Sequence, residues 1–115
     1  MHELSLAMSI LDIAGEESDR RGGAEIKSIY LKLGPLSGVI KQALISAFDL
    51  AREMSPFSKV ELVVEEVPLR VRCHVCDTER ELPCFQDLCC PECGTPCGDV
   101  VCGRELEIVA MEIES

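Results

Sequence analysis

The stretch CHVCDTERELPCFQDLCCPEC, residues 73–93, contains two Cys-x-x-Cys motifs separated by 13 residues. Each motif presents two sulfurs on one tight turn, and two such turns can close a tetrahedron around Zn²⁺ with each sulfur about 2.3 Å from the metal. The spacing therefore predicts a zinc site formed by Cys73, Cys76, Cys90 and Cys93. Four sulfur ligands leave no position for water, so we expect a structural zinc that supplies much of the folding energy of a segment with little core of its own.

The ligand set and the metal have alternatives. Cys89 lies beside the first cysteine of the second motif and could replace it, although this would lose the two-residue spacer. Iron also binds four-sulfur sites. The surplus cysteines are either small buried or loop thiols, or they include a thiol pair, Cys97 with Cys102 or Cys84 with Cys97. His74, inside the first motif, is expected to be an exposed turn residue rather than a ligand.

The distribution of the eight cysteines favours a metal-binding protein over a disulfide-rich secreted one. All eight lie between residues 73 and 102, whereas a disulfide framework would connect the whole chain. The start Met1-His2-Glu3 has an acidic residue where a signal peptide carries basic ones. No apolar stretch approaches the roughly 18 residues of a membrane span. We therefore expect a cytoplasmic protein with no membrane partner.

The overall charge argues against a nucleic-acid partner. The 115 residues carry a formal net charge of −10, which repels phosphate backbones. Aromatic residues make up only 3% of the chain, with no Trp, so there are few rings on which bases could stack.

Apolar periodicity predicts two helices and three strands outside the cysteine-rich segment. In the helical segments the apolar residues recur at three- and four-residue steps, and in the strands they alternate with polar ones. The expected elements are a helix over 4–14 that ends in the polar run 16–23, a strand over 29–33, a helix over 40–54 capped by Ser37, and strands over 60–64 and 106–113.

These elements predict an α+β fold. We expect a small domain with two helices and a three-stranded sheet, made of residues 1–69 plus 104–115. Residues 70–103 are expected to form a zinc-ribbon-like module inserted into this domain.

The first residues, Met1-His2-Glu3, can form a chelate for a second metal. The α-amine of Met1 and the amide nitrogen of His2 close a five-membered ring on a metal, and that amide with Nδ1 of His2 closes a six-membered one. Three nitrogens in a row suit the square-planar geometry of Ni(II) or Cu(II). The fourth corner of the square is open to water, another side chain or a partner. If Glu3 supplies its amide nitrogen, one of the three nitrogens of Met1 and His2 must leave the metal. The ordinary alternative is a polar residue in front of a helix with a helix-initial acid.

Three segments together resemble a known family. Residues 1–7 (MHELSLA), the two Cys-x-x-Cys motifs and residues 103–106 (GREL) are similar to the HypA/HybF hydrogenase nickel-incorporation family. The resemblance extends over essentially the whole chain, in length and in the order of the elements. It implies a nickel metallochaperone for the maturation of nickel-iron hydrogenase, with a structural zinc in the four cysteines.

The resemblance also implies residue roles and partners. His2 would bind nickel together with the Met1 amine and Glu3. The usual partners would be a nickel-handling GTPase of the hydrogenase maturation system and the hydrogenase large subunit. His74 is the only other histidine, so an additional role in urease maturation is not supported.

Two other functions compete with a metal-delivery protein that is not an enzyme. A zinc-ribbon module that binds protein or nucleic acid fits the cysteine spacing, but the charge and the scarcity of aromatic residues weigh against nucleic acid. A thiol-redox enzyme would use the surplus cysteines, but no Cys-x-x-Cys motif starts a helix after a predicted strand, where a lowered thiol pKa is expected.

Overall fold

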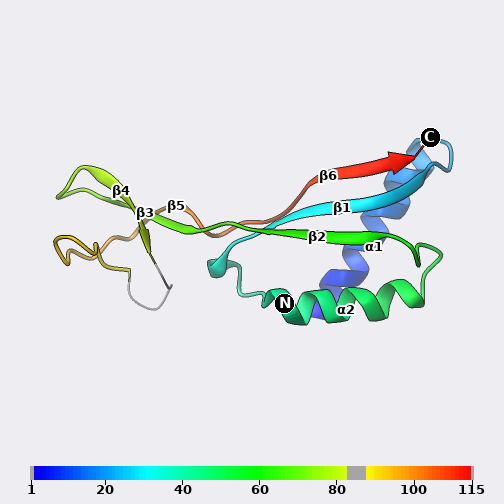
Figure 1. Ribbon diagram of the computed structural model, residues 1–115, viewed down its shortest axis with the longest axis horizontal. Helices are drawn as coiled ribbons and strands as arrows, with labels where there is room; N and C mark the ends of the chain where they lie inside the picture. The colour runs from blue at the N-terminus through cyan, green and yellow to red at the C-terminus, as the bar shows by residue number, and fades with distance from the viewer. Residues whose placement is uncertain (1, 83–87, 115) are drawn as a thin grey trace. The chain divides into compact units, whose positions relative to one another are not determined.

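The computed structural model describes residues 2–82 and 88–114 (Figure 1). The chain divides into two compact units. The first, the helical unit, comprises Met1–Leu31, Val39–Glu65 and Ile108–Ser115, and the second, the cysteine unit, comprises Lys32–Gly38 and Glu66–Glu107. The assignment of nickel to one unit and zinc to the other stays a prediction. In the described part of the chain, no helix is long and apolar enough to cross a membrane.

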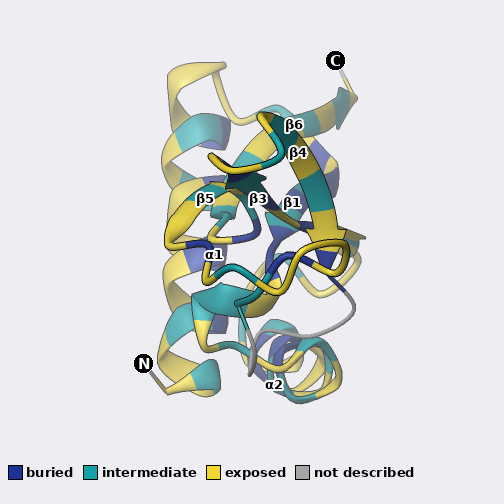
Figure 2. Cartoon of the chain, turned by 90° about the vertical axis from the view of Figure 1, so that its left-hand side faces the viewer, coloured by how far each residue is buried: buried dark blue, intermediate teal, exposed yellow. Residues whose placement is uncertain are grey.

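The helical unit consists of two helices packed on a three-stranded sheet with strand order β2-β1-β6, which confirms the predicted α+β fold. The two helices contact each other and lie on one face of the sheet (Figure 1). The exposed outer side of α1 and its buried inner side are visible in Figure 2. The elements of this unit are α1 (Glu3–Arg20), β1 (Glu25–Leu33), α2 (Lys41–Glu53), β2 (Glu61–Glu66) and β6 (Leu106–Glu114).

An aliphatic core holds the helical unit together. Ala7, Ile10 and Ala14 of α1 recur at helical spacing and are at most 2% exposed. The other buried apolar residues of this core are Leu11, Ile26, Ile29, Leu31, Leu44, Phe48, Ala51 and Val60.

Helix α1 is longer than the sequence predicts. The polar run expected to end it continues the helix to Arg20. Glu17 forms ion pairs with Arg20 at 3.1 Å and Arg21 at 2.8 Å, at the (i, i+3) and (i, i+4) spacings that stabilise an exposed helical turn. The helix then ends in a turn in which the Gly23 N–H donates to the Ser18 carbonyl at 2.8 Å.

Ser37 does not cap α2, so that prediction is wrong. Residues Pro35–Ser37 form a separate 3-10 turn, and Gly38 follows in the left-handed region at φ 80°. Left-handed backbone interrupts a helix, so α2 begins only at Lys41, with Ile40 in the N-cap position.

The cysteine unit has a sheet of its own, which the sequence pattern does not predict. Its three antiparallel strands lie in the order β4-β3-β5, with Cys73 opposite Thr78 at the β3–β4 turn. Six buried residues form a small core, whereas little core was expected: Leu69, Val71, Cys73, Leu82, Cys90 and Cys97. The strands are β3 (Leu69–Cys73), β4 (Thr78–Leu82) and β5 (Asp99–Cys102).

Two glycines of the cysteine unit allow the backbone of residues 32–38 to cross closely over the segment that follows β5. The Gly34 N–H donates to the Glu105 carbonyl at 2.8 Å, and the Leu36 N–H donates to the Gly103 carbonyl at 2.7 Å. A Cβ atom on Gly34 would lie 2.2 Å from the Gly103 oxygen. Gly103 itself adopts φ 127°, a conformation that favours glycine. Residues 32–38 are thereby tied to the segment that follows β5.

We expect Gly34→Ala to destabilise the protein by about 2 kcal/mol or more, because the added methyl group overlaps backbone that cannot move without breaking the crossing. Gly98→Ala is the matched control, since a Cβ atom there has no neighbour within 4 Å. The measurement is the free energy of unfolding in urea. Equal stabilities of the two variants would contradict the crossing as described.

Candidate metal centre

The sulfur atoms of Cys73, Cys76, Cys90 and Cys93 all lie within 4.8 Å of one another. The Sγ atoms of Cys73 and Cys93 are 3.6 Å apart, and those of Cys76 and Cys90 are 3.9 Å apart. Tetrahedral zinc with bonds of about 2.3 Å places its sulfur ligands about 3.8 Å from one another. The four residues therefore fit a single Zn²⁺ ion in a closed shell.

Local backbone turns aim the sulfurs of each motif. Cys73 ends β3 and is fully buried, and the backbone N–H of Cys76 donates to its sulfur at 3.4 Å. In the second motif the Gly94 N–H donates to the Cys90 carbonyl at 2.8 Å, with Gly94 at φ 75°. Glycine reaches this left-handed conformation without a steric penalty, so the chain can turn sharply after the second motif.

Neighbouring groups shift the pKa values of the cluster thiols in opposite directions. The hydroxyl and backbone N–H of Thr95 donate to the Cys93 thiolate and lower the pKa of Cys93 to about 6. The adjacent sulfurs of Cys93 and Cys73 raise the pKa of Cys76 to about 12. Like charges this close disfavour each other, and a divalent cation among them reverses that effect. The cluster therefore has the donor chemistry of a metal site as well as its geometry.

The cluster contains Cys90 and not Cys89. Cys90 is buried at 2% exposure, whereas Cys89 lies outside the cluster and pairs with Pro96 in an isolated β-bridge. Two adjacent residues in extended backbone point in opposite directions, so only one of them can face the other sulfurs. The assignment of the cluster as a zinc site stays a proposal.

The surplus cysteines have separate surroundings. The Cys97 thiol is buried and donates to the Thr95 carbonyl at 3.3 Å, and burial beside Cys73 raises its pKa. The Cys102 thiol donates to the Pro68 carbonyl at 3.3 Å, and Cys97 and Cys102 are both free thiols, so their action as a thiol pair stays a prediction. Cys84, and with it the second possible pair, lies outside the described residues.

The predicted nickel residues lie at the start of α1. Met1 is outside the described residues. His2 is exposed in the N-cap position at φ −76° and ψ 129°, and its carbonyl accepts from the Leu6 N–H at 3.0 Å. Glu3 is the first helical residue and is half-buried. His74, the other histidine, lies 3.3 Å from Asp99 and is exposed, as expected for a turn residue.

One further residue faces the core of the cysteine unit, although the two motifs do not point to it. Arg80 lies on β4 opposite Val71, which shares a core with Cys90, and its Nε atom is buried. The signal was present: Thr78, Arg80 and Leu82 alternate with glutamates and share one face of the strand.

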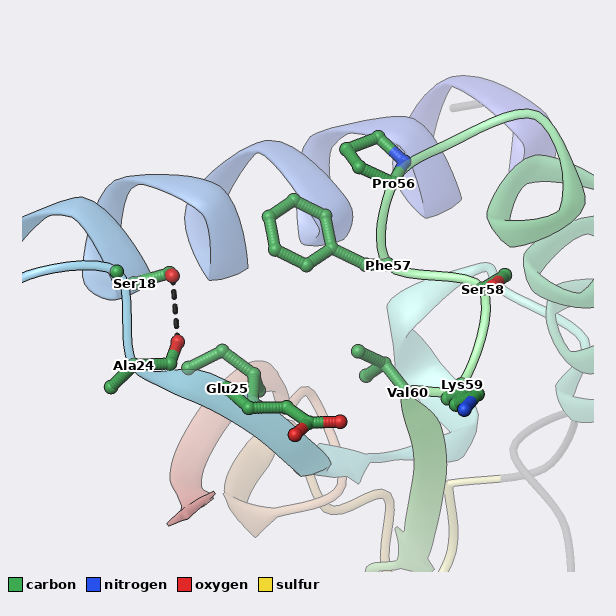
Figure 3. A pocket seen from close by; sticks show the side chains of 10 residues that line it. Ser18, Ala24, Glu25, Pro56, Phe57, Ser58, Lys59 and Val60 are labelled. Carbon is green, nitrogen blue, oxygen red and sulfur yellow. Dashed lines mark hydrogen bonds between the residues drawn. The ribbon is translucent and has the colours of Figure 1, made fainter. Parts of the chain in front are cut away.

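A separate groove lies in the helical unit, between the end of α1, the start of β1 and the loop before β2 (Figure 3). It has a volume of about 320 Å³, and the Ser18 hydroxyl donates to the Ala24 carbonyl at its wall. Glu25 and Lys59 are its charged residues, and none of its lining residues is a histidine or cysteine. This donor set does not fit a metal ion, so the cysteine cluster is the stronger site.

Comparisons with known proteins agree with one another. The model of the family described as hydrogenase/urease nickel incorporation, metallochaperone, HypA matches residues 1–113. The hydrogenase maturation factor HypA of Chloroflexus aggregans is 46% identical over 112 residues, which cover 97% of this chain and 98% of the relative. The corresponding factor of Roseiflexus sp. is 43% identical over 114 residues, with 99% and 93% covered.

Solved structures show the same fold. The solution structure of the Ni metallochaperone HypA from Helicobacter pylori superimposes with a TM-score of 0.65 at 21% identity, covering 98% of this chain and 97% of that one. A second solution structure, of a HypA protein, gives a TM-score of 0.69 at 21% identity, with 99% and 97% covered.

Substitution of two neighbouring cysteines tests which of them belongs to the metal site. We expect Cys90→Ser to lose the bound metal, because it removes one of four sulfurs from the cluster. Cys89→Ser should keep one metal ion per chain, because this cysteine lies outside the cluster. Metal content of the purified variants by mass spectrometry is the measurement, and the reverse result would show that the cluster is assigned to the wrong residue.

Proposed function

We propose that this chain, which belongs to the HypA hydrogenase/urease nickel-incorporation metallochaperone family, binds Ni(II) at its N-terminus and delivers it during maturation of nickel-iron hydrogenase. A structural zinc ion is held by Cys73, Cys76, Cys90 and Cys93. The protein binds and releases a metal rather than catalysing a reaction. Family membership supports the nickel role, and the four-sulfur cluster is the observation that supports the zinc site.

The proposed nickel site uses the α-amine of Met1 and the amide and imidazole nitrogens of His2, with Glu3 beside them. The backbone N–H groups at the start of a helix have no carbonyl acceptor within the helix. His2 is the N-cap and Glu3 the first helical residue, so a metal can replace the amide proton of His2 without breaking a helical hydrogen bond, and a nitrogen from Glu3 could bind only in place of another ligand. The exposed imidazole of His2 is also available.

The field of α1 favours this mode of binding. The start of a helix carries partial positive charge, which repels a free cation but stabilises an anion. A deprotonated amide nitrogen is such an anion, and so is the Glu3 carboxylate in the first turn. Ni(II) bound through deprotonated amides therefore suits the start of α1 better than Ni(II) bound through neutral ligands alone.

The proposed zinc ion has a structural role. Four thiolates close its shell, so it supplies no open position for water or cargo. The ion would join the β3–β4 turn to the second motif, which are otherwise connected by a small core. On this proposal the zinc stays in place while nickel is bound and released.

Family membership also supports the partners. We propose a nickel-handling GTPase of the hydrogenase maturation system as the partner in nickel transfer and the hydrogenase large subunit as the recipient, both in the cytoplasm. The net charge of −10 disfavours a nucleic-acid partner.

We expect His2→Ala to abolish tight nickel binding while zinc content stays unchanged, because His2 is exposed and outside both cores. His74→Ala is the matched control, since this second histidine is also exposed. Two residues added before Met1 should lower nickel affinity at least tenfold, because the amine becomes an amide. Calorimetry measures the nickel affinities of the wild type, the two histidine variants and the extended chain, none of which carries a purification tag.

Equal nickel affinity of the untagged and extended chains would place the ligands elsewhere. A loss of binding in His74→Ala but not in His2→Ala would move the nickel site to the cysteine unit.

Zinc removal should unfold one unit only. A strong chelator should disorder residues 66–107, because a core of six small or medium side chains does not suffice without the metal. Helices α1 and α2 keep their own core and should remain folded. Amide spectra recorded before and after chelation test this, and loss of the helical signals together with the others would contradict it.

A further inference from the structure

Arg80 occupies a position where an apolar side chain is expected. In the antiparallel pairing of β3 with β4 it lies opposite Val71, which is fully buried in the small core. Along β4 it shares the inward face with Thr78 and Leu82, while Glu79 and Glu81 face solvent. The charged side chain of Arg80 therefore lies on the face of β4 that covers the core of the cysteine unit.

Arg80 faces the core that contains cysteines of the cluster. Val71, its cross-strand partner, shares this core with Cys73 and Cys90, and Cys76 packs against it. The Nε atom of Arg80 is buried and has no hydrogen-bond partner among the residues that the structure describes. A buried guanidinium nitrogen without an oxygen partner is costly unless negative charge lies nearby.

We infer that Arg80 is a positioning residue of the metal centre, whose guanidinium donates to the thiolates of Cys76 and Cys90 and offsets part of their charge. The inference rests on the zinc site proposed above. Four thiolates and one Zn²⁺ carry a net charge of about −2, which is costly in a partly buried site. Arginine keeps its charge under all ordinary conditions, so the compensation is permanent.

The two contacts also join the two halves of the centre. Cys76 belongs to the first motif and Cys90 to the second, and no strand pairing connects these two residues. A planar guanidinium with several N–H donors can hold both sulfurs in one arrangement. Donation to a ligating sulfur also withdraws electron density from it, so acids and electrophiles should attack the bound thiolates more slowly.

Substitution of Arg80 tests the inference through zinc release. Arg80→Met keeps the length and removes the charge, and Arg80→Lys keeps the charge but loses the planar fork. Arg70→Met is the matched control, because Arg70 lies on the neighbouring strand, is exposed and forms a 3.8 Å ion pair with Glu79. Each purified zinc protein is mixed with excess of a coloured zinc chelator, and the rate of zinc transfer is recorded.

We expect every variant to carry one zinc per chain. Arg80→Met should release zinc about 10 to 100 times faster than the wild type, the range typical of lost partners of metal ligands. The rate of zinc release from Arg80→Lys should lie between those of the wild type and Arg80→Met. The rate from Arg70→Met should stay within about twofold of the wild type. Alkylation of the zinc-bound thiolates by iodoacetamide should accelerate in the same order.

Equal release from Arg80→Met and the wild type would overturn the inference, and so would an equal acceleration in Arg70→Met. If Arg80→Met does not hold zinc at all, the test uses Arg80→Lys. Zinc release from Arg80→Lys that is faster than from the wild type supports the inference, and an equal rate overturns it. Wild-type protein that contains no zinc would instead overturn the proposed zinc site, and the inference with it.

Discussion

Four cysteine sulfurs within 4.8 Å of one another cannot all be negatively charged unless a cation lies among them. This electrostatic constraint organises the cysteine unit. Strand β3 ends at Cys73, the turn before β4 presents Cys76, and the second motif returns through Gly94 to complete the cluster. Thr95 lowers the pKa of Cys93, whereas the neighbouring sulfurs of Cys93 and Cys73 raise that of Cys76.

The two proposed metal sites of this HypA-family chain differ in the properties that keep two metals apart. The cysteine cluster is sulfur-only, partly buried and closed, which suits zinc held permanently. The start of α1 offers nitrogen donors in an exposed position, which suits square-planar Ni(II) that must leave again. The role inferred for Arg80 fits this division, because a cation that faces the core of the cysteine unit offsets negative charge at the site that keeps its metal. On this account, the type of ligand atom and the accessibility of each site keep zinc and nickel apart, rather than metal affinity alone.

Local patterns in the sequence were enough for the α+β class, the two helices, the first sheet and the cysteine motifs, because each rests on spacing within a few residues. The sequence pattern wrongly predicts Ser37 as a helix cap, since the left-handed Gly38 separates it from α2. The sequence pattern does not reveal the β4-β3-β5 sheet, because its strands are only four or five residues long and β4 carries charges at three consecutive positions. Arg80 could not be placed at the cluster, because its contact with the two motifs depends on the cross-strand register opposite Val71.

The central claim, that one chain holds zinc by sulfur and carries nickel by nitrogen, is tested most directly by X-ray absorption at both metal edges. The sample is untagged protein with one equivalent of added Ni(II). The account predicts four sulfur neighbours at about 2.3 Å around zinc, unchanged by nickel, and only nitrogen or oxygen neighbours around nickel. Sulfur neighbours at the nickel edge, or zinc released in proportion to the nickel bound, would contradict it.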